Sequence, residues 1–536
     1  MVIGAAALAA VAVRVAAQLQ SGFLTGLWQY DDAVYLGAAL RIVHGVQPYH
    51  GAFVLMGPPG APLLLTPLAE LARVVGTQRA LVVARLAMPL VAGANVVLLG
   101  LLLRHRAPLV AAVACFALAL YPDGILTTLT VMLEPPLEFF CLLGAVILFD
   151  GDDLARSRRR VLLAGVTFGV AGTVKAWAIL PVVVIVVLCL PRRRQRLIPF
   201  SAGVAGGFLA ICGPFLVATP VAFMQQVVFA QLGRRGPSRA SAAVRLEFLS
   251  GLWAGLRTGA QTPQLLLLTG AVCTATLITV GAVFAAAHRP VDAAPRVGDG
   301  PPRAGTSPLE RFALGAAGVV LAGLLWPPEF WYHYPAFFGP FLALVLGLTA
   351  GRAAAARPFP VLATIAVVLA AAAYHAAAIP WSLPTLRNPA AQIAAVDALV
   401  PAGACVVTNN PEFTIGVDRY TASSARCPQI VDPLATTTVL SGDRSTPRGD
   451  ARAASAWLRY FHRAQYLMLS TGSHARVLWS PALTRYVHQH FVLVSRTPWL
   501  ILKHVSSSPL RPPSGAPRLP RKVASRGRRP GSGSVT

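Results

Sequence analysis

Two adjacent acids just past the first apolar run are the first residues in this sequence with the chemistry of a reactive site. Asp31 and Asp32 follow Trp28 and precede Tyr35. A carboxylate at the edge of a membrane can serve as a general base, and ionisable groups there are costly enough to be functional candidates. Capping of a helix would account for one acid. An adjacent pair among aromatic residues favours a functional site.

The segment after this pair is expected to form a helix that positions it. Its apolar residues recur at helical spacing, at Val34, Leu36, Leu40 and Val43. This pattern predicts a helix along the membrane surface with Asp31 near its N-terminus. Gly45 is expected to end the helix, and Pro48 and Tyr49 to turn the chain.

Two further groups of candidate residues lie in the middle of the chain. Glu134 and Glu138 are four residues apart, so a regular helix places both on one face, although the two intervening prolines disturb its start. Lys175 and Trp177 lie at the turn of a tight apolar hairpin. The Lys175 cation is suited to binding phosphate.

A fourth group combines aromatic residues with a histidine and an acid near residue 330. Aromatic residues are ordinary anchors at a membrane interface. Anchoring does not account for the ionisable residues among them. The members of this group are Glu329, Trp331, His333 and Tyr334.

The elements that must hold these residues are membrane spans. The chain has 536 residues, of which 55% are hydrophobic and only 12% charged, and its formal net charge is +26. About a quarter of the residues are charged in soluble domains. Long apolar runs broken by arginine clusters exclude a soluble enzyme and account for the net charge without nucleic acid. Abundant Ala, Gly and Arg also indicate a GC-rich bacterial genome.

The apolar runs predict an α-helical polytopic membrane protein with about 11 transmembrane helices. The runs lie near 2–18, 82–103, 107–121, 132–149, 161–176, 177–191, 197–217, 263–287, 312–327, 336–351 and 358–379. The pair between Arg160 and Arg192 is short enough to predict a tilted or broken hairpin.

Arginine clusters predict the orientation of these spans. By the positive-inside rule, the clusters near 104–106, 156–160, 192–196, 289–311 and 352–357 are cytoplasmic, as is the N-terminus. All four candidate groups then fall at outer span ends. Their acids, imidazole, cation and aromatic rings fit sugar transfer from a lipid phosphate, with a carboxylate deprotonating the acceptor hydroxyl.

The domain organisation follows from the same pattern. Residues 1–380 form the transmembrane core with a first outer loop at 19–81, and 381–505 form a small extracytoplasmic α+β C-terminal domain. Strands are expected at Val406–Val407, 464–470 and 490–502, and a helix at 451–463. The basic tail 506–536 is expected to be disordered.

Cysteine usage adds one prediction about the C-terminal domain. Cys405 and Cys427 are its only cysteines, and an oxidising compartment would allow a disulfide closing a loop of about 23 residues.

With these residues in view, the sequence resembles the membrane-embedded glycosyltransferases of the C superfamily (GT-C). The resemblance is to actinobacterial polyprenyl-phosphate-sugar-dependent enzymes related to the mannosyltransferases of glycosyltransferase family 87, and more distantly to protein mannosyltransferases. It covers roughly residues 20–350. It rests on Asp31-Asp32-Ala-Val-Tyr35, Gly45 to Tyr49, Pro58-Pro59 with Pro62 and Pro67, Glu134-Pro-Pro-Leu-Glu138, Val174-Lys175-Ala-Trp177 and Trp331-Tyr-His333-Tyr334-Pro335.

The resemblance implies a GT-C-like fold and an inverting transfer. Its general base would be Asp31 or Asp32, of which we prefer Asp31, with His333 as partner and Lys175 at the donor phosphate. The remaining predicted donor- or substrate-binding residues are Tyr35, Tyr49, Glu134, Glu138, Trp177, Glu329, Trp331 and Tyr334.

The implied donor is a mannose- or arabinose-type sugar on polyprenyl phosphate, and the acceptor an envelope glycan, glycolipid or protein outside a bacterial plasma membrane. The large C-terminal domain departs from family 87. So does the replacement of an extended Phe-Thr-Tyr-Pro-Pro motif by Phe53-Val-Leu-Met-Gly-Pro58-Pro59. The sugar and the acceptor therefore stay open. No cofactor is expected, because the sequence has neither a Gly-rich phosphate loop nor His/Cys metal spacing; acids of the outer loops remain able to hold a divalent ion.

Two other function classes remain as alternatives. A transporter or flippase for lipid-linked sugars should show internal repeats and charges near the bilayer midplane; the sequence shows no convincing repeat, and its candidate residues lie at span ends. A non-catalytic scaffold for envelope assembly would leave the acidic pair unexplained.

Overall fold

The computed structural model describes residues 1–232, 240–250, 306–326, 329–356, 390–442, 447–470, 476–496 and 499–505, with isolated positions between 366 and 386. The predicted spans at 263–287 and 358–379 and the basic tail at 506–536 lie outside the described residues.

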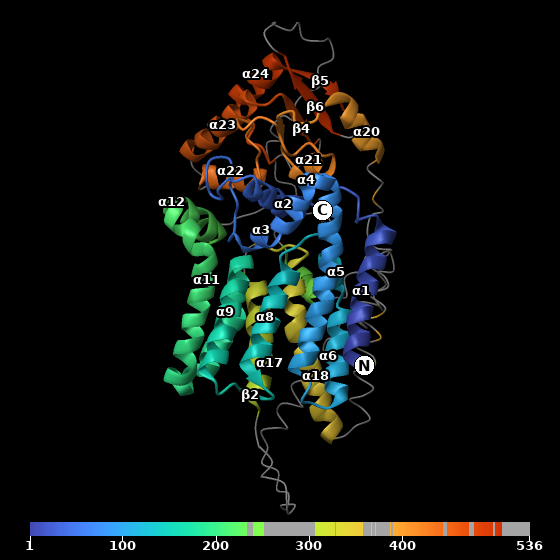
Figure 1. Cartoon of the computed structure of the whole chain (residues 1–536), viewed down its shortest axis with the longest axis vertical. Coiled ribbons are helices and arrows are strands. Elements are labelled where there is room, and N and C mark those ends of the chain that lie inside the picture. Colours follow the sequence, from blue (N-terminus) through green and yellow to red (C-terminus); the bar gives the residue numbers. More distant parts are fainter. Residues whose placement is uncertain are drawn as a thin grey trace, which may run out of the picture.

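Long helices run side by side through the body of the molecule (Figure 1). The longer ones are α1 (Val2–Ser21), α5 (Thr77–Leu102), α11 (Ile198–Ala218), α17 (Pro308–Leu325) and α18 (Gly339–Ala356). The shorter ones are α6 (Pro108–Ala119), α8 (Glu134–Leu148), α9 (Arg158–Val174) and α10 (Ile179–Cys189). These shorter helices correspond to the predicted apolar runs between 107 and 191.

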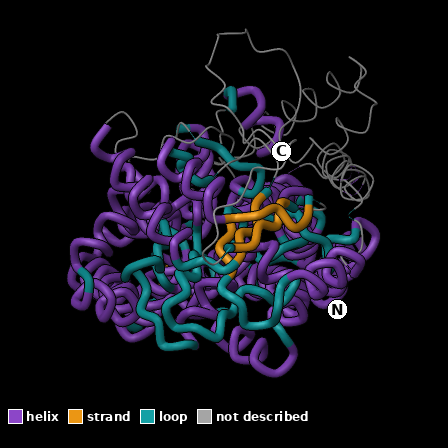
Figure 2. The backbone as a smooth tube through the Cα atoms, turned by 90° about the horizontal axis from the view of Figure 1, so that it is seen from above, coloured by secondary structure: helices purple, strands orange, loops and turns teal. Residues whose placement is uncertain are grey.

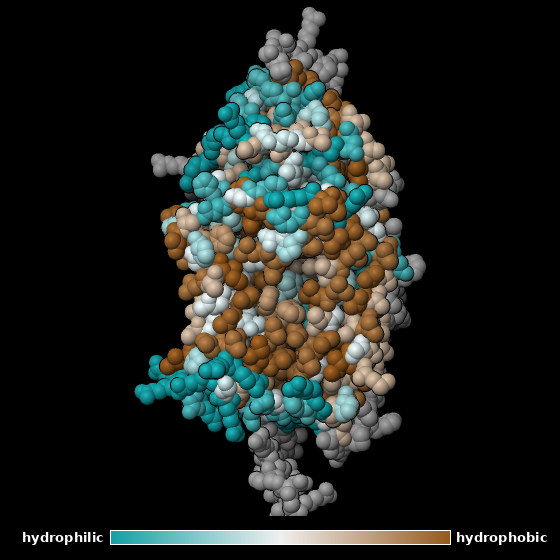
Figure 3. All heavy atoms as spheres, viewed as in Figure 1, coloured by the Kyte–Doolittle hydropathy of each residue, from teal (hydrophilic) through white to brown (hydrophobic). Residues whose placement is uncertain are grey.

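The helical body has the properties of a membrane domain. Within the described ranges, five segments are long and apolar enough to cross a membrane: Val2–Ser21, Thr77–Leu102, Ala176–Ala218, Pro308–Leu325 and Tyr334–Arg352. On the face shown in Figure 3, hydrophobic residues form a band across the middle of the molecule, and hydrophilic residues gather toward both ends. The chain is therefore an α-helical polytopic membrane protein, as its composition predicts.

Charged connections meet at one end of the bundle. Arg106 forms ion pairs with Asp152 at 2.7 Å and with Glu310 at 3.3 Å, and Glu310 also pairs with Arg352 at 2.5 Å. Glu310 additionally completes a capping box with Ser307 at the start of α17. Three of the arginine-bearing connections predicted to share one side of the membrane are thus in contact with one another.

Glycine stripes allow α9 and α11 to pack backbone against backbone. Gly165 and Gly169 of α9 face Gly203 and Gly207 of α11, and a Cβ atom on any of the four would lie 2.2–2.3 Å from a carbonyl oxygen of the facing helix. Small residues four positions apart permit this close approach between membrane helices.

The predicted broken hairpin is present at Lys175. Helix α9 ends at Val174, Lys175 has extended backbone angles (φ −153°, ψ 135°), and a short 3-10 turn η1 (Ala176–Ala178) leads into α10. The chain then passes through η2 (Leu190–Arg192) and η3 (Arg193–Leu197) into α11. Because Arg158–Arg160 begin α9, Lys175 lies at its opposite end, about 25 Å away for 17 residues at 1.5 Å each.

A helix follows the first span at the predicted position. Helix α2 (Tyr30–Val43) carries Asp31 and Asp32 in its first turn, where the helix dipole favours acids. It ends before Gly45, whose φ of 76° suits glycine. The rest of the loop contains α3 (Gly60–Leu64) and α4 (Thr66–Val75).

Short elements complete the membrane part. They are α7 (Pro122–Thr127), β1 (Phe149–Asp150), β2 (Asp153–Leu154), α12 (Pro220–Phe223), η4 (Met224–Phe229), α13 (Ala230–Leu232), α14 (Ala242–Leu249) and η5 (Tyr334–Phe338). Of these, η5 leads directly into α18 and places the aromatic segment around His333 at the end of that helix.

The C-terminal domain, residues 390–505, stacks on α2 and α3 at one end of the bundle (Figure 1). Its sheet has the order β3-β4-β6-β5, formed by β3 (Val406–Thr408), β4 (Tyr466–Leu469), β5 (Phe491–Ser495) and β6 (Leu500–His504) (Figure 2). Its helices are α20 (Ala390–Leu399), α21 (Pro411–Gly416), α22 (Pro433–Ser441), α23 (Pro447–His462) and α24 (Pro481–His490).

The sheet is mixed, and one sequence expectation about it was wrong. Strand β3 is parallel to β4, with Val406 opposite Tyr466, whereas β6 is antiparallel to both neighbours. The predicted single strand at 490–502 is instead the hairpin β5–β6, because its apolar run is broken between Ser495 and Leu500. Cys405 and Cys427 form a disulfide with a Cα–Cα distance of 5.4 Å.

Candidate active site

Four segments that are distant in sequence bring Asp31, His333, Glu134 and Lys175 into one series of contacts. His333 Nε2 lies 3.8 Å from Asp31 Oδ2, and His333 Nδ1 lies 2.9 Å from Glu134 Oε1. The same carboxylate oxygen of Glu134 accepts a hydrogen bond from Lys175 Nζ at 2.5 Å. Residues from all four predicted groups therefore meet at one place.

The two ring nitrogens of His333 have different partners. The buried carboxylate of Glu134 lies against Nδ1, and this arrangement favours a proton on that nitrogen. Nε2 then faces Asp31. The geometry makes His333 a link between a buried acid and an acid at the surface of the site.

Aromatic rings enclose the Lys175 cation. Its Nζ lies 4.3 Å from the ring centroid of Trp177 and 4.4 Å from that of Tyr334, and the two rings contact each other edge to face. Cation–π contacts of this kind hold an ammonium group in place. Trp177 and Tyr334, both predicted site residues, thus lie directly at Lys175.

Asp31 and Asp32 have different surroundings despite being neighbours. The Asp31 side chain is 35% exposed, whereas that of Asp32 is fully buried. Asp32 Oδ2 accepts from Arg85 Nε at 2.8 Å and lies 2.8 Å from Arg85 Nη2. Of the pair, Asp31 is therefore the acid that a substrate can reach.

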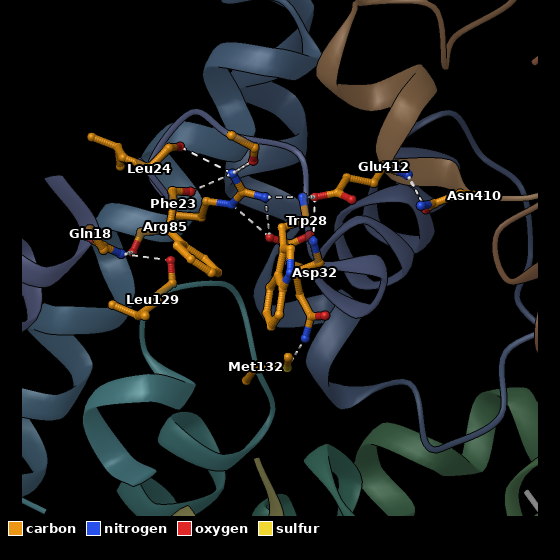
Figure 4. Close-up of polar contacts among 12 residues, drawn as sticks. Gln18, Phe23, Leu24, Trp28, Asp32, Arg85, Leu129, Met132, Asn410 and Glu412 are labelled. Atoms are coloured by element: carbon orange, nitrogen blue, oxygen red, sulfur yellow. Dashed lines mark hydrogen bonds and ion pairs between the residues drawn. The ribbon is translucent and has the colours of Figure 1, made fainter. Parts of the chain in front are cut away.

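Arg85 joins Asp32 to the C-terminal domain. Its Nη2 lies 3.3 Å from Glu412 Oε1, and its Nη1 donates to the carbonyl oxygens of Phe23 and Gly26 (Figure 4). Glu412 Oε1 also accepts from the backbone N–H groups of residues 28 and 29. We call Asp32, Arg85 and Glu412 the buried ion cluster. It fixes the start of α2 against both α5 and α21.

The buried ion cluster contains two carboxylates and one guanidinium. Burial, together with the negative charge of Asp32, raises the pKa of Glu412 to about 7. Burial likewise raises the pKa of Asp32, which Arg85 opposes. One cation cannot compensate both acids away from water, so the cluster favours retention of one proton.

Tyr30 makes a second connection between α2 and the C-terminal domain. Its hydroxyl donates to Asp432 Oδ1 at 2.6 Å and accepts from the backbone N–H of Leu434 at 3.0 Å. The guanidinium carbon of Arg476 lies 3.5 Å from the centroid of the Tyr30 ring. Residues on both sides of Asp31 are therefore held by the C-terminal domain.

Tyr332 lies among the acids of the site. Its hydroxyl accepts a hydrogen bond from Gln29 Nε2 at 2.5 Å, and burial together with the charge of Asp31 raises its pKa well above the usual value. Trp331 and Glu329, both predicted site residues, flank it in sequence; Trp331 is partly buried and Glu329 is 5% exposed.

Three predicted site residues are engaged elsewhere. Glu138 accepts from Asn95 at 3.1 Å and, together with Arg14, lines a small cavity within the bundle. The Tyr49 hydroxyl donates to the carbonyl of Gly57 at 2.8 Å, and its ring packs on Phe223. The half-buried side chain of Tyr35 packs against the apolar clusters around α2. The substrate-binding roles of Glu138, Tyr49 and Tyr35 stay predictions.

The sequence interpretation overlooked several residues of this region. Arg85 falls within the apolar run at 82–103. Glu412, Asp432 and Arg476 belong to the C-terminal domain, for which the sequence predicts no catalytic or binding residue. An arginine near the end of a membrane span is itself a signal, since such a residue requires a partner.

Metal ligation has no support in the described ranges. Among these residues, no group of three or more His, Cys, Asp or Glu side chains is arranged to hold a metal ion.

Comparison with known proteins identifies the fold. No protein-family model and no curated protein matches the sequence. The structure is similar to that of ArnT from Cupriavidus metallidurans bound to undecaprenyl phosphate, with a TM-score of 0.57, 15% identity and coverage of 93% of this chain and 98% of that one. The apo state of the same protein gives a TM-score of 0.56, 16% identity and coverage of 92% and 97%.

A second similar structure is the Archaeoglobus fulgidus oligosaccharyltransferase in complex with Zn and sulfate. Its TM-score is 0.50, its identity 13%, and the match covers 94% of this chain and 73% of that one. At such identities the similarity is one of fold. The chain has the GT-C-like fold of these membrane glycosyltransferases.

Proposed function

We propose that this protein is a membrane glycosyltransferase that moves a sugar from polyprenyl phosphate to an acceptor hydroxyl. The sugar is of the mannose or arabinose type, and the acceptor is an envelope glycan, glycolipid or protein on the outer face of a bacterial plasma membrane. The observation that carries the proposal is the series Asp31, His333, Glu134 and Lys175, in which an accessible acid is linked to a cation held between aromatic rings.

The comparisons support the class of donor. ArnT of the same fold was solved bound to undecaprenyl phosphate, a polyprenyl phosphate. A donor of this kind has its lipid in the bilayer and its phosphate at the membrane surface. The cation of Lys175, directly after the last residue of α9, is the group we propose to bind this phosphate.

The two ends of the series, Asp31 and Lys175, act at different points of the reaction. Asp31 removes the proton from the acceptor hydroxyl as its oxygen attacks the anomeric carbon. The bond from that carbon to the phosphate oxygen breaks, and its electron pair stays on the phosphate, whose charge Lys175 stabilises. A single displacement of this kind inverts the anomeric centre.

His333 and Glu134 support the base in this scheme. Glu134 fixes the imidazole so that Nε2 faces Asp31. The imidazole can then take up the proton that Asp31 collects, and Asp31 returns to its ionised form for the next cycle.

Turnover of defined donors tests the proposal. Purified protein is incubated with polyprenyl-phosphate mannose, arabinose and glucose, and release of polyprenyl phosphate and labelling of an acceptor extract are measured. Asp31→Asn is expected to lower the rate on the order of 10²–10⁴-fold. The matched control is Glu70→Gln, which alters a half-exposed acid of α4 that forms an ion pair with Arg73.

Two outcomes contradict the proposal. One is full activity of Asp31→Asn. The other is wild-type protein that cleaves none of the donors; if it instead moves a lipid-linked sugar across vesicles intact, a transporter replaces the transferase.

A further inference from the structure

Arg476 is a cation at the start of α2, the helix that carries the proposed base, and the reaction scheme above does not use it. It belongs to the C-terminal domain, five residues before the start of α24 at Pro481, and its side chain is half-buried. Its guanidinium carbon lies 3.5 Å from the centroid of the Tyr30 ring, and Tyr30 directly precedes Asp31 in the chain. Within the described part of the chain, its N–H groups make no hydrogen bond and no ion pair.

The ring beneath Arg476 is held in a fixed position. Tyr30 is 8% exposed, and its hydroxyl is bonded both to Asp432 and to the backbone of Leu434. Asp432 in turn accepts from the N–H of Ala435 as the N-cap of α22. The acid nearest to Arg476 therefore has other partners, and the guanidinium keeps donors available for a ligand.

Stacked arginines of this kind suit anionic ligands. A guanidinium that lies flat on an aromatic ring has its N–H groups directed outward in one plane, a geometry that matches the two oxygens of a phosphate or carboxylate. Lysine cannot reproduce this planar fork.

Position assigns this cation to the acceptor side of the reaction. Within the membrane part, His333 and Glu134 connect Asp31 to Lys175. Arg476 belongs to the C-terminal domain and contacts α2 at Tyr30. In an inverting displacement the acceptor and the leaving phosphate lie on opposite sides of the sugar. A second cation at the start of the helix that carries the base therefore contacts the acceptor, which is the molecule that the base deprotonates.

We propose that Arg476 binds an anionic group, a phosphate or a carboxylate, on the acceptor and so places the acceptor hydroxyl at Asp31. This inference rests on the proposed glycosyl transfer and adds a substrate class to it: acceptors that carry negative charge near the hydroxyl to be modified.

Matched acceptor probes test the inference. Octyl mannoside and octyl mannoside 6-phosphate are compared at saturating donor, for wild-type protein and for Arg476→Gln. Loss of a hydrogen-bonded ion pair predicts a roughly 10- to 100-fold higher KM for the phosphorylated probe. The KM values for the neutral probe and for the donor stay unchanged. Arg476→Lys, which keeps the charge and loses the fork, falls between wild type and Arg476→Gln.

Controls separate binding from folding and from catalysis. Arg485→Gln removes an exposed arginine of the same domain and is expected to change neither KM. Thermal midpoints without ligand check that the variants fold. The rise in midpoint on adding each probe measures binding without turnover, so the result does not depend on the choice of donor.

The outcomes distinguish this inference from the proposed function. If wild-type protein cleaves no donor, the proposed transfer fails. If wild-type protein cleaves a donor but binds both probes equally, or if Arg476→Gln weakens both equally, the anionic acceptor is refuted. A higher KM for the donor alone would assign Arg476 to the donor phosphate and overturn the inference.

Discussion

Replacing Glu412 by Gln is expected to remove a pH dependence from the stability of this protein. Glu412 shares the buried ion cluster with Asp32, and a single guanidinium, Arg85, faces both carboxylates. Glutamine keeps the side-chain oxygen that accepts the backbone N–H groups of Trp28 and Gln29, just before α2. The substitution therefore imitates the protonated acid without removing its hydrogen bonds.

The sign of the effect follows from the proton count. The pKa of Glu412 is about 7 in the folded protein, against an ordinary value of 4.5. Between these two values the folded state keeps a proton that the unfolded state has released, so the free energy of unfolding falls as pH rises. The slope reaches at most about 1.4 kcal/mol per pH unit and falls off near both pKa values, so the loss over this interval of about 2.5 pH units is about 3 kcal/mol. Below and above the interval Glu412 contributes no slope.

Unfolding of purified protein in detergent between pH 4.5 and 8.5 measures this loss. The free energy of unfolding of wild type relative to Glu412→Gln should decline by about 3 kcal/mol across the interval. Glu70→Gln, which alters an exposed acid, should give a constant difference over the same range. A difference between wild type and Glu412→Gln that does not change with pH would refute the account of the cluster, as would one that changes in the opposite direction.

Three further predictions concern other parts of the structure. Lys175→Met should raise the KM for the polyprenyl-phosphate donor roughly 10-fold or more and leave the acceptor KM unchanged; steady-state kinetics that show no change in donor KM would contradict its role. Gly207→Ala should cost about 1–3 kcal/mol in thermal unfolding, because a Cβ atom would lie 2.2 Å from a carbonyl oxygen of the facing helix, whereas Gly206→Ala points into open space and should not destabilise the protein. Replacing Cys405 and Cys427 by Ser should cost about 3 kcal/mol, since their bond joins positions 22 residues apart. Equal thermal midpoints of wild type with and without reductant would contradict that estimate.

Local patterns were sufficient to predict the elements that carry the site. Apolar spacing predicted a surface helix after Asp31, and α2 begins at Tyr30 and ends before Gly45. The short apolar pair around Lys175 predicted a broken hairpin, and the chain is extended at that residue. Both features depend on residues within about one turn of one another. The strand at Val406 likewise lies where the sequence placed it.

Long-range pairing could not be predicted in the same way. Arg85 and Glu412 are 327 residues apart, and no local pattern relates them. The difference between Asp31 and Asp32 depends on which side of α2 faces α5, and the adjacent acids look equivalent in the sequence. Arg476 becomes a candidate only once the C-terminal domain is seen to lie on Tyr30.

The distance along the chain between Arg85 and Glu412 has a consequence for biosynthesis. At about 5–20 residues per second, the ribosome reaches Glu412 roughly 15–65 s after Arg85. During that time the residues just before α2 lack the carboxylate of Glu412, and Tyr30 lacks its contact with Asp432. The nascent protein therefore assembles its helices before the neighbours of Asp31 are fixed. The geometry around that acid is therefore completed only after the C-terminal domain has been synthesised.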